Sequence, residues 1–479
     1  MSHPNTKFTF SRRDFLKTTA AAGAGLVLAP VILGEEAKVA SKTINVAFIG
    51  VGTEGRVLLE NNCLKMKSHN LRYVAIADIW PYNRDRVVRL LKKYGHPANG
   101  YTDFQEMLEK EKELDAVIIA SPDFVHAEHT IGCLKAGKHV YCEKEMSNSL
   151  ELAKQMVVTA KETKKLLQIG HQRRSNPRYQ VALEYMQKKK AIGRPTFVSA
   201  HWNRSKRLDV GTPKGYELDD ATLKKYGYDT MQRFRNWRWY KKFSGGPIAD
   251  LGSHQIDIFN WVLNASPRAV MATGGLDYYE GIEWYDNISA LYEWDAEWEG
   301  KKIIVRGFYQ VLSTTSHGGY AETFMGDQGS LVISEQATIG GIRREQEAPE
   351  ADWEKELQKA LPKKPEAAKP AEPTPAEGDA AAAKPAAKKD EEEGVAHSVP
   401  APGRYYPPIS APYPQPKDAP PSKPEHMPHL ENFFDAVLNG TALTCPGEVG
   451  YDTAVTVLKV NEAVATGKRL EYTPAEFKA

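Results

Sequence analysis

Ile44-Asn45-Val46-Ala47-Phe48-Ile49-Gly50-Val51-Gly52-Thr53-Glu54-Gly55-Arg56 is the stretch around which the rest of this chain can be interpreted. Its first six residues, 44–49, are mostly apolar and suit a buried strand. The run breaks into Gly-x-Gly-x-x-Gly and continues with apolar residues at 57–59. This order predicts a strand, a glycine turn and a helix whose N-terminus holds a dinucleotide pyrophosphate. A plain glycine turn without a ligand is the alternative.

Residues 72–77 predict a second strand, and Asp78 closes it. A carboxylate at this position accepts hydrogen bonds from the adenosine ribose hydroxyls. It favours NAD, since a carboxylate repels the 2′-phosphate of NADP. Arg84 and Arg86 follow Asp78 and keep NADP open as an alternative.

The composition is that of a globular protein with no strong charge bias. The chain has 479 residues, with 41% hydrophobic and 26% charged residues and a formal net charge of +2. Such a balance gives no field that would attract nucleic acid or an anionic membrane. The four cysteines show neither a Cys-x-x-Cys pair nor metal-like spacing. We therefore expect no metal site and no disulfide framework.

The first forty residues, 1–40, are expected to be a targeting segment. Ser11-Arg12-Arg13-Asp14-Phe15-Leu16-Lys17 precedes an apolar run rich in Ala, Gly and Leu. The pattern resembles the bacterial twin-arginine export signal, which implies contact with that export machinery and a periplasmic destination. Because no clear small-x-small cleavage site follows, an uncleaved membrane anchor is the alternative.

Residues 41–170 alternate strand and helix patterns, as a doubly wound parallel α/β sheet requires. Such sheets bind ligands beyond the carboxyl ends of their strands, where Gly50, Asp78, Ser121 and Lys144 fall. The expected strands are 44–49, 72–77, 116–120, 139–142 and 166–169, and the expected helices are 83–94, 104–113, one ending at Gly137, and 150–164.

The remainder predicts a second α/β domain with a mainly antiparallel open sheet. Within 171–344, longer strands are expected at 197–202, 288–294, 303–310 and 331–333, the last preceded by a hairpin turn. Residues 345–425 form a low-complexity Pro/Ala/Lys insert that we expect to be disordered or polyproline-like. In 426–479, amphipathic helices at 429–438 and 452–465 are expected to complete the second domain.

Residues 244–259 contain the densest signal for a reactive site. Pro247 suits a first helical turn after two glycines. One face of the expected helix is apolar, while Asp250, His254 and Asp257 share another. Two carboxylates and an imidazole in one line suit acid/base chemistry. A helix cap beside a buried histidine is the alternative.

Several motifs occur together in an order that resembles the glucose-fructose oxidoreductase, inositol dehydrogenase and rhizopine catabolism (Gfo/Idh/MocA) family. They are the glycine turn, Ser121-Pro122 with His126, Glu143-Lys144, and Gly245-Gly246 followed by Asp250-x-x-x-His254. The resemblance implies an N-terminal Rossmann domain that binds NAD or NADP and a second domain that binds sugars or cyclitols. The expected cofactor-binding residues are Gly50, Val51, Gly52, Thr53, Glu54, Gly55, Asp78, Ser121, Pro122, His126, Glu143 and Lys144.

The same resemblance implies a catalytic group of Lys144, Asp250 and His254. His254 would accept the hydroxyl proton, Lys144 would orient and stabilise the reacting oxygen, and Asp250 would hold charge and geometry. Glu145 replaces the proline usual after this lysine. The replacement puts the aim of Lys144 in question, and Glu145 could also pair with Lys144.

Aromatic residues interleaved with Arg and Asn suggest a surface for a sugar ring. The expected substrate residues, besides Asp250 and His254, are Arg173, Trp202, Arg204 and Trp237. The alternative places the tryptophans in the core or in a dimer interface. The open sheet of the family often forms oligomers, so a homo-oligomer through the C-terminal sheet is also expected.

These inferences favour an exported oxidoreductase that moves hydride between a sugar or cyclitol hydroxyl and a tightly bound nicotinamide cofactor. Free NAD(P) is not expected outside the cytoplasm, so the cofactor must be recycled within the site. One alternative is a glycoside hydrolase or lyase that oxidises its sugar transiently. Another is a non-catalytic sugar-binding protein.

Overall fold

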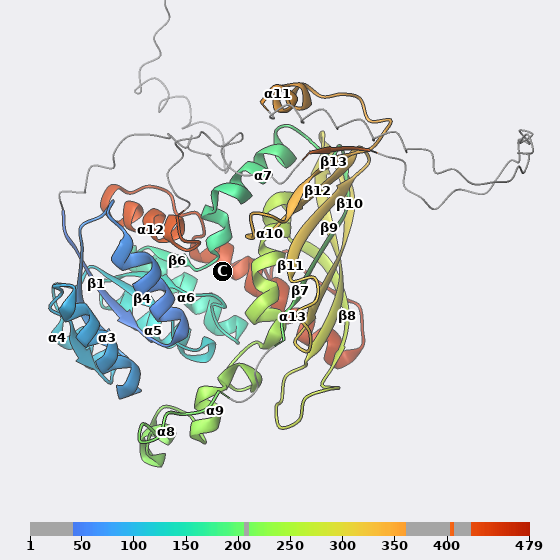
Figure 1. The fold of residues 1–479 in the computed structure, drawn as a ribbon. Helices are drawn as coiled ribbons and strands as arrows, with labels where there is room; N and C mark the ends of the chain where they lie inside the picture. The colour runs from blue at the N-terminus through green and yellow to red at the C-terminus, as the bar shows by residue number, and fades with distance from the viewer. Residues whose placement is uncertain (1–41, 206–209, 361–402, 407–422) are drawn as a thin grey trace, which may run out of the picture. The chain divides into compact units, whose positions relative to one another are not determined.

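The computed structural model describes residues 42–205, 210–360, 403–406 and 423–479 (Figure 1). The expected targeting segment, 1–40, and most of the expected low-complexity insert lie outside the described residues.

The N-terminal part contains a parallel sheet in the order β3-β2-β1-β4-β5-β6. This is the order of the doubly wound dinucleotide-binding fold and confirms the expected fold class. Its middle strand β4 is fully buried, in keeping with its unbroken apolar sequence. The strands are β1 (Ile44–Ile49), β2 (Leu71–Ala77), β3 (Asn99–Tyr101), β4 (Ala116–Ile119), β5 (His139–Cys142) and β6 (Leu167–Ile169), and the helices are α3 (Pro81–Lys93), α4 (Phe104–Lys110), α5 (Asp123–Lys135) and α6 (Leu150–Thr163).

The glycine turn has the geometry its residues predict. Gly50 has a φ of +80°, which favours glycine. A Cβ on Gly55 would lie 2.2 Å from the Gly50 carbonyl oxygen, so glycine is required where helix and strand approach. The helix is short, however: α2 (Thr53–Arg56) passes into a π-helical turn, Val57–Asn62.

The second part is built on a sheet to which the described residues contribute nine strands, in the order β14-β13-β12-β11-β7-β10-β9-β8-β15 (Figure 1). All neighbours are antiparallel except β7 and β10, which are parallel. The expected mainly antiparallel sheet is therefore confirmed. Its strands are β7 (Pro195–Asn203), β8 (Pro267–Gly275), β9 (Asn287–Trp298), β10 (Lys301–Leu312), β11 (Tyr320–Gly326), β12 (Gly329–Ile333), β13 (Gly340–Arg344), β14 (Arg404–Tyr406) and β15 (Leu470–Glu471).

Of the two C-terminal helices, one packs on the second sheet as expected and the other does not. Helix α13 (Gly447–Thr466) contacts β8 of the second sheet and α6 of the first part. Helix α12 (Met427–Asn439) instead places Leu430 and Phe433 in the core that contains Phe48 of β1. Helix α12 therefore covers the parallel sheet and does not complete the second domain. An amphipathic pattern identifies a buried face but not the surface that buries it.

Part of the range assigned to the insert is structured. Helix α11 (Asp352–Ala360) and strand β14 lie within 345–425. Glu354 of α11 forms ion pairs with Arg344 at 3.2 Å and with Arg404 at 2.9 Å. These pairs hold both segments to the edge of the sheet, so the expectation of disorder is wrong for them.

A segment between β7 and the region of Asp250 reaches back to the parallel sheet. It contains α8 (Asp220–Lys225) and α9 (Met231–Arg235). The Trp80 indole N–H donates to the Tyr216 carbonyl at 2.6 Å, and the rings of Phe124 and Tyr228 meet edge to face at 5.6 Å. The segment thus lies beside the end of the sheet where ligands are expected.

Candidate active site

The structure brings together the three residues expected to form the catalytic group. Lys144 lies just beyond β5, Asp250 lies in the π-helical turn Ile248–Gly252, and His254 lies in α10 (Ser253–Leu263). The Lys144 ammonium donates to the Asp250 carbonyl at 2.5 Å and lies 3.7 Å from its Oδ1. This contact, between residues 106 positions apart, joins the loop after β5 to the turn that precedes α10.

His254 is held in its neutral form. Burial, followed by repulsion from Lys144 and Arg173, lowers its pKa well below the ordinary value. Its Nδ1 is buried without a hydrogen-bond partner among the described residues. The ring lies 5.6 Å from that of Trp202. A neutral imidazole between a cation and an aromatic face can accept a proton from a substrate hydroxyl.

His171 is a second imidazole in this region that the sequence interpretation did not select. Its ring lies 6.3 Å from that of His254. Both of its ring nitrogens are buried without described hydrogen-bond partners, and burial lowers its pKa to about 4. A signal existed, because His171 follows β6 at the carboxyl end of the sheet, where ligands are expected.

Asp257 does not belong to the reactive group, although it shares a helix face with Asp250 and His254. Both of its oxygens accept hydrogen bonds from Arg174, at 2.7–2.9 Å, and Oδ1 also accepts one from the Thr453 hydroxyl. Arg174 holds the pKa of Asp257 below its ordinary value against the effect of burial. The prediction that all three side chains take part in acid/base chemistry is therefore wrong for Asp257.

Glu145 neither displaces Lys144 nor pairs with it. The peptide bond between the two residues is cis, and Lys144 still reaches Asp250. The Glu145 carboxylate turns inward and accepts a hydrogen bond from the Met146 backbone N–H at 2.8 Å. Burial raises its pKa to about 8, which favours the neutral acid at pH 7.

The glycine turn fits a dinucleotide. A Cβ on Gly52 would meet no atom within 4 Å, so space exists where a pyrophosphate approaches the backbone. Asp78 lies beside this turn and accepts hydrogen bonds from the backbone N–H groups of Val51 at 2.9 Å and Trp80 at 2.8 Å. Each carboxylate oxygen has a second lone pair with which to accept a ribose hydroxyl.

A cavity of about 390 Å³ opens beside Gly52 and Thr53. Arg56, Arg86 and Arg235 line it and suit the phosphates of a dinucleotide. Arg84 is bound elsewhere, to Asp85 at 2.8 Å and to the Thr102 hydroxyl. Arg235 carries no local sequence signal for this position, because only the tertiary contact of α9 with Trp80 brings it here.

The remaining expected cofactor residues lie in the loops after β4 and β5 and at the start of α5, and they do not line this cavity. His126 is buried, and its ring nitrogens lie 2.7 Å from the Glu145 carbonyl and 2.6 Å from the Ser121 carbonyl. It thereby ties the loop that contains Ser121 and Pro122 to the loop after β5. Its place is structural rather than at an open surface.

Glu143 forms a polar cluster with Glu54, a residue of the glycine turn, and with His426. It is 5% exposed and accepts a hydrogen bond from the Tyr141 hydroxyl at 3.1 Å. Burial and the charge of Glu54 raise the pKa of Glu143 to about 7. Glu54 itself lies 3.4 Å from the His426 imidazole. The carboxylate oxygens of Glu54 and Glu143 and the imidazole nitrogen of His426 lie within 4.8 Å of one another. No further observation among the described residues points to an ion there.

The expected substrate residues occupy different depths. Trp202 and Arg204 lie at the end of β7, where the Trp202 ring stacks on Tyr320 at 4.5 Å. Arg173 is only 1% exposed and is paired with Glu322 and Glu335, so it supports Trp202 from below, at 5.1 Å. Trp237 stacks on Arg238, 4.3 Å away, and Arg238 binds Asp250 at 3.2 Å.

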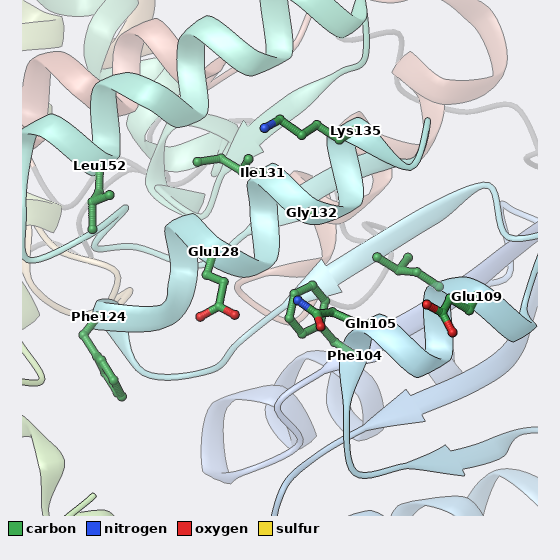
Figure 2. A pocket seen from close by; sticks show the side chains of 10 residues that line it. Phe104, Gln105, Glu109, Phe124, Glu128, Ile131, Gly132, Lys135 and Leu152 are labelled. Atoms are coloured by element: carbon green, nitrogen blue, oxygen red, sulfur yellow. The ribbon is translucent and has the colours of Figure 1, made fainter. Parts of the chain in front are cut away.

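A separate hollow of about 650 Å³ is lined by residues of α4 and α5 together with Leu152 of α6 (Figure 2). Phe104, Glu128 and Lys135 are among the residues that line it, whereas Lys144, Asp250 and His254 are not. It is not part of the site described above.

Comparisons with known proteins agree with this architecture. Residues 44–171 match the oxidoreductase family with an NAD-binding Rossmann fold, GFO_IDH_MocA, and residues 181–332 match the GFO/IDH/MocA C-terminal domain. The chain belongs to the Gfo/Idh/MocA oxidoreductase family. Residues 9–29 match the twin-arginine translocation pathway signal sequence. An NAD-binding domain and an export signal thus occur in one Gfo/Idh/MocA chain.

Two of the relatives are named as inositol dehydrogenases. The chain is 30% identical over 184 residues to an inositol 2-dehydrogenase of Rubrobacter xylanophilus, covering 38% of this chain and 50% of that protein. It is 28% identical over 233 residues to a myo-inositol 2-dehydrogenase of Thermotoga maritima, covering 49% and 59%. The chain thus spans about half the length of these curated relatives.

A solved levoglucosan dehydrogenase in complex with NADH and L-sorbose has the same fold. The TM-score is 0.64 at 17% identity, with 90% of this chain and 99% of that chain covered. Within the described residues, no helix combines the length and apolar character needed to cross a membrane.

Proposed function

We propose that this protein is an exported, NAD-dependent oxidoreductase that moves hydride between a sugar or cyclitol hydroxyl carbon and a tightly bound cofactor. The observation that carries the proposal is the contact of Lys144 with Asp250 beside neutral His254, beyond the carboxyl ends of the parallel strands. The inositol and levoglucosan dehydrogenases among its relatives support a polyhydroxylated ring as substrate.

Each residue has a distinct part in the chemistry. When bound, the nicotinamide supplies the hydride acceptor. His254 accepts the proton of the reacting hydroxyl, for which its neutral form is required. The Lys144 ammonium donates a hydrogen bond to the same oxygen and stabilises the negative charge that develops on it. Asp250 holds Lys144 in place through its carbonyl and carboxylate oxygens.

Export to the periplasm is part of the proposal and constrains the redox cycle. With no free NAD expected outside the cytoplasm, hydride taken from one hydroxyl must return to a second substrate or to the same one. The placement of Arg235 and Gly211 over the cavity beside Gly52 supports a retained cofactor. Denaturing the purified protein should release NAD(H) in about equimolar amount, identified by mass spectrometry. A protein that is empty and does not take up added NAD would contradict the proposal.

The export signal also favours a second candidate, a glycoside hydrolase or lyase in which the sugar is oxidised and then reduced again. Transient oxidation, at C3 of the sugar, acidifies the neighbouring C2 proton and permits elimination of the glycosidic group. A glycoside deuterated at C2 separates the two candidates. Deuterium lost to solvent with cleavage supports the second, whereas full retention in an oxidised product supports the first.

A sugar-binding protein without activity is distinguished from both by Lys144→Ala. Turnover by the wild type that disappears in this variant would exclude the binding module, since simple binding does not require the lysine to reach a reacting oxygen.

A further inference from the structure

We propose that the substrate carries an anionic substituent, and that Arg204 and Arg238 bind it beside the reacting hydroxyl. This assignment rests on the proposed function, because it concerns the substrate of the same site. It adds a substrate class, the acidic sugars, and two specificity-determining residues.

The first observation is a charge imbalance around Asp250. Its carboxylate lies 3.7 Å from the Lys144 ammonium, 3.4 Å from Arg204 Nη2 and 3.2 Å from Arg238 Nε. Three cations therefore share one carboxylate. Asp123 interacts with both Lys144 and Arg238, and Glu143 and Glu145 interact with Lys144. Burial raises the pKa of Glu143 to about 7 and that of Glu145 to about 8, so neither is fully ionised at pH 7. Among the described residues, Lys144, Arg204 and Arg238 therefore exceed the charge of Asp250 and Asp123 by one positive charge when only these two carboxylates are ionised.

The neighbouring arginines show that this chain matches its buried cations elsewhere. Arg173 faces two carboxylates, Glu322 and Glu335, and Arg174 is bound through two nitrogens to Asp257. Burying a cation without a partner is costly, so such matching is the rule inside proteins. The excess of positive charge beside Asp250 therefore stands out within the same site.

The unmatched charge lies on the open side of the site. The side chains of Lys144 and Asp250 are each 12% exposed, whereas those of Arg204 and Arg238 are 44% and 43% exposed. Within the described residues, each guanidinium uses one nitrogen to bond Asp250. A guanidinium has five N–H donors, so each retains donors for the paired oxygens of a carboxylate, sulfate or phosphate.

Both guanidinium groups are held by aromatic rings that position them before a ligand arrives. Arg238 lies 4.3 Å from the Trp237 ring centroid, and Arg204 lies 5.9 Å from that of Trp202. Arg204 directly follows β7, and Arg238 belongs to the 3-10 turn Trp237–Trp239; both contact Asp250. Two fixed cations that converge beside the catalytic lysine form a receptor for an anion on the substrate.

The test measures binding to the full-length protein loaded with NADH, so that oxidation does not interfere. D-Glucuronate, D-galacturonate and the 6-phosphates of glucose and galactose are titrated calorimetrically against neutral glucose and galactose. Inorganic sulfate and phosphate serve as probes that do not depend on the sugar. We expect at least one anionic sugar to bind about tenfold more tightly than its neutral counterpart, with the preference reduced at high salt. Preference among the anions distinguishes a carboxylate site from a phosphate site.

Arg204→Ala and Arg238→Ala should each weaken binding of the anionic sugar more than binding of the neutral sugar, so that this preference is lost. Arg204→Lys and Arg238→Lys should retain part of the preference for the anionic sugar. Lysine keeps the positive charge but lacks the paired N–H donors of the guanidinium. Arg89→Ala, which removes an exposed arginine of α3, is the matched control and should behave as the wild type.

Equal binding of charged and neutral sugars, no binding of any anion, or equal weakening of both sugar classes by the alanine variants would overturn the proposal. The last result would mean that the arginines only hold Asp250. The proposed function fails separately. A sugar acid that binds through the arginines but never reduces bound NAD⁺ would contradict hydride transfer alone. Oxidation of a sugar acid that is unchanged in both alanine variants would contradict the anion site alone.

Discussion

Lys144 lies two residues beyond the end of β5 with its ammonium directed at Asp250, and the expected chemistry of the site depends on that placement. Replacement by methionine keeps much of the side-chain volume and removes the charge. We expect Lys144→Met to lower kcat/KM for sugar oxidation by about 10² to 10⁴. NADH affinity, measured by fluorescence titration, should stay within a few-fold. Lys92→Met, at an exposed position of α3, is the control. Undiminished turnover in Lys144→Met would remove the lysine from the mechanism.

Asp78 should make cofactor affinity depend on pH. Burial raises the pKa of its carboxyl to about 6, so in the free protein it is charged mainly above that pH. Ribose hydroxyls bind the charged form, so NAD lowers this pKa and binds more tightly as the pH rises. Between pH 5 and 7, we expect the affinity for NAD to rise by at most about tenfold, and the full rise requires that NAD lowers the pKa to below about 5.

Asp78→Asn should bind NAD more weakly and with a flat pH profile in the same titration. If the dependence persists in Asp78→Asn, another group causes it, such as Glu143, whose pKa is raised to about 7.

At the scale of elements, the glycine turn provides a matched pair of substitutions. A Cβ on Gly52 meets nothing within 4 Å, whereas one on Gly55 would lie 2.2 Å from the Gly50 carbonyl oxygen. Gly52→Val should therefore keep the melting temperature of the nucleotide-free protein and lose the bound nucleotide. Gly55→Ala should lower the free energy of unfolding by about 1–3 kcal/mol.

Calorimetric melting of the nucleotide-free proteins, followed by mass spectrometry of released nucleotide, separates the two effects. A Gly52→Val protein that retains stoichiometric NAD would show that the open space beside this residue is not the phosphate site.

The spacing of Asp250, His254 and Asp257 predicted their common helix face but not the residues that each of them contacts. Spacing placed Asp250, His254 and Asp257 on one face, and all three do follow one helical course. That spacing did not predict which residue each side chain contacts. Asp257 meets Arg174, whereas Asp250 meets Lys144, Arg204 and Arg238. Identical carboxylates thus acquired different roles from residues far away in the chain.

At the scale of the whole molecule, the open face of the second sheet is the surface through which we expect oligomers to form. Met271, Leu291 and Ile304 are 47%, 48% and 40% exposed, and Met271 and Leu291 are direct cross-strand neighbours. Exposed apolar groups on adjacent strands are typical of interfaces. The wild type should sediment as a dimer or larger species, and Met271→Lys combined with Leu291→Lys should sediment as a monomer.

Glu297→Lys, at an exposed position of the same strand, is the control for a change of charge alone and should leave the sedimentation of the wild type unchanged. A wild-type protein that is monomeric at micromolar concentration would contradict this expectation.

Local sequence determined the strand–turn–helix order of the first domain, the glycine positions and the type of the second sheet. Apolar periodicity and glycine conformations are properties of neighbouring residues and can be read without the rest of the chain. Tertiary structure alone decided that α12 covers the parallel sheet and that Arg235 reaches the cavity beside Gly52. It also decided that Arg173, which lies next to Trp202, forms an ion pair with Glu322. A side chain's partners depend on which distant surfaces fold against it, and burial then sets its charge through desolvation.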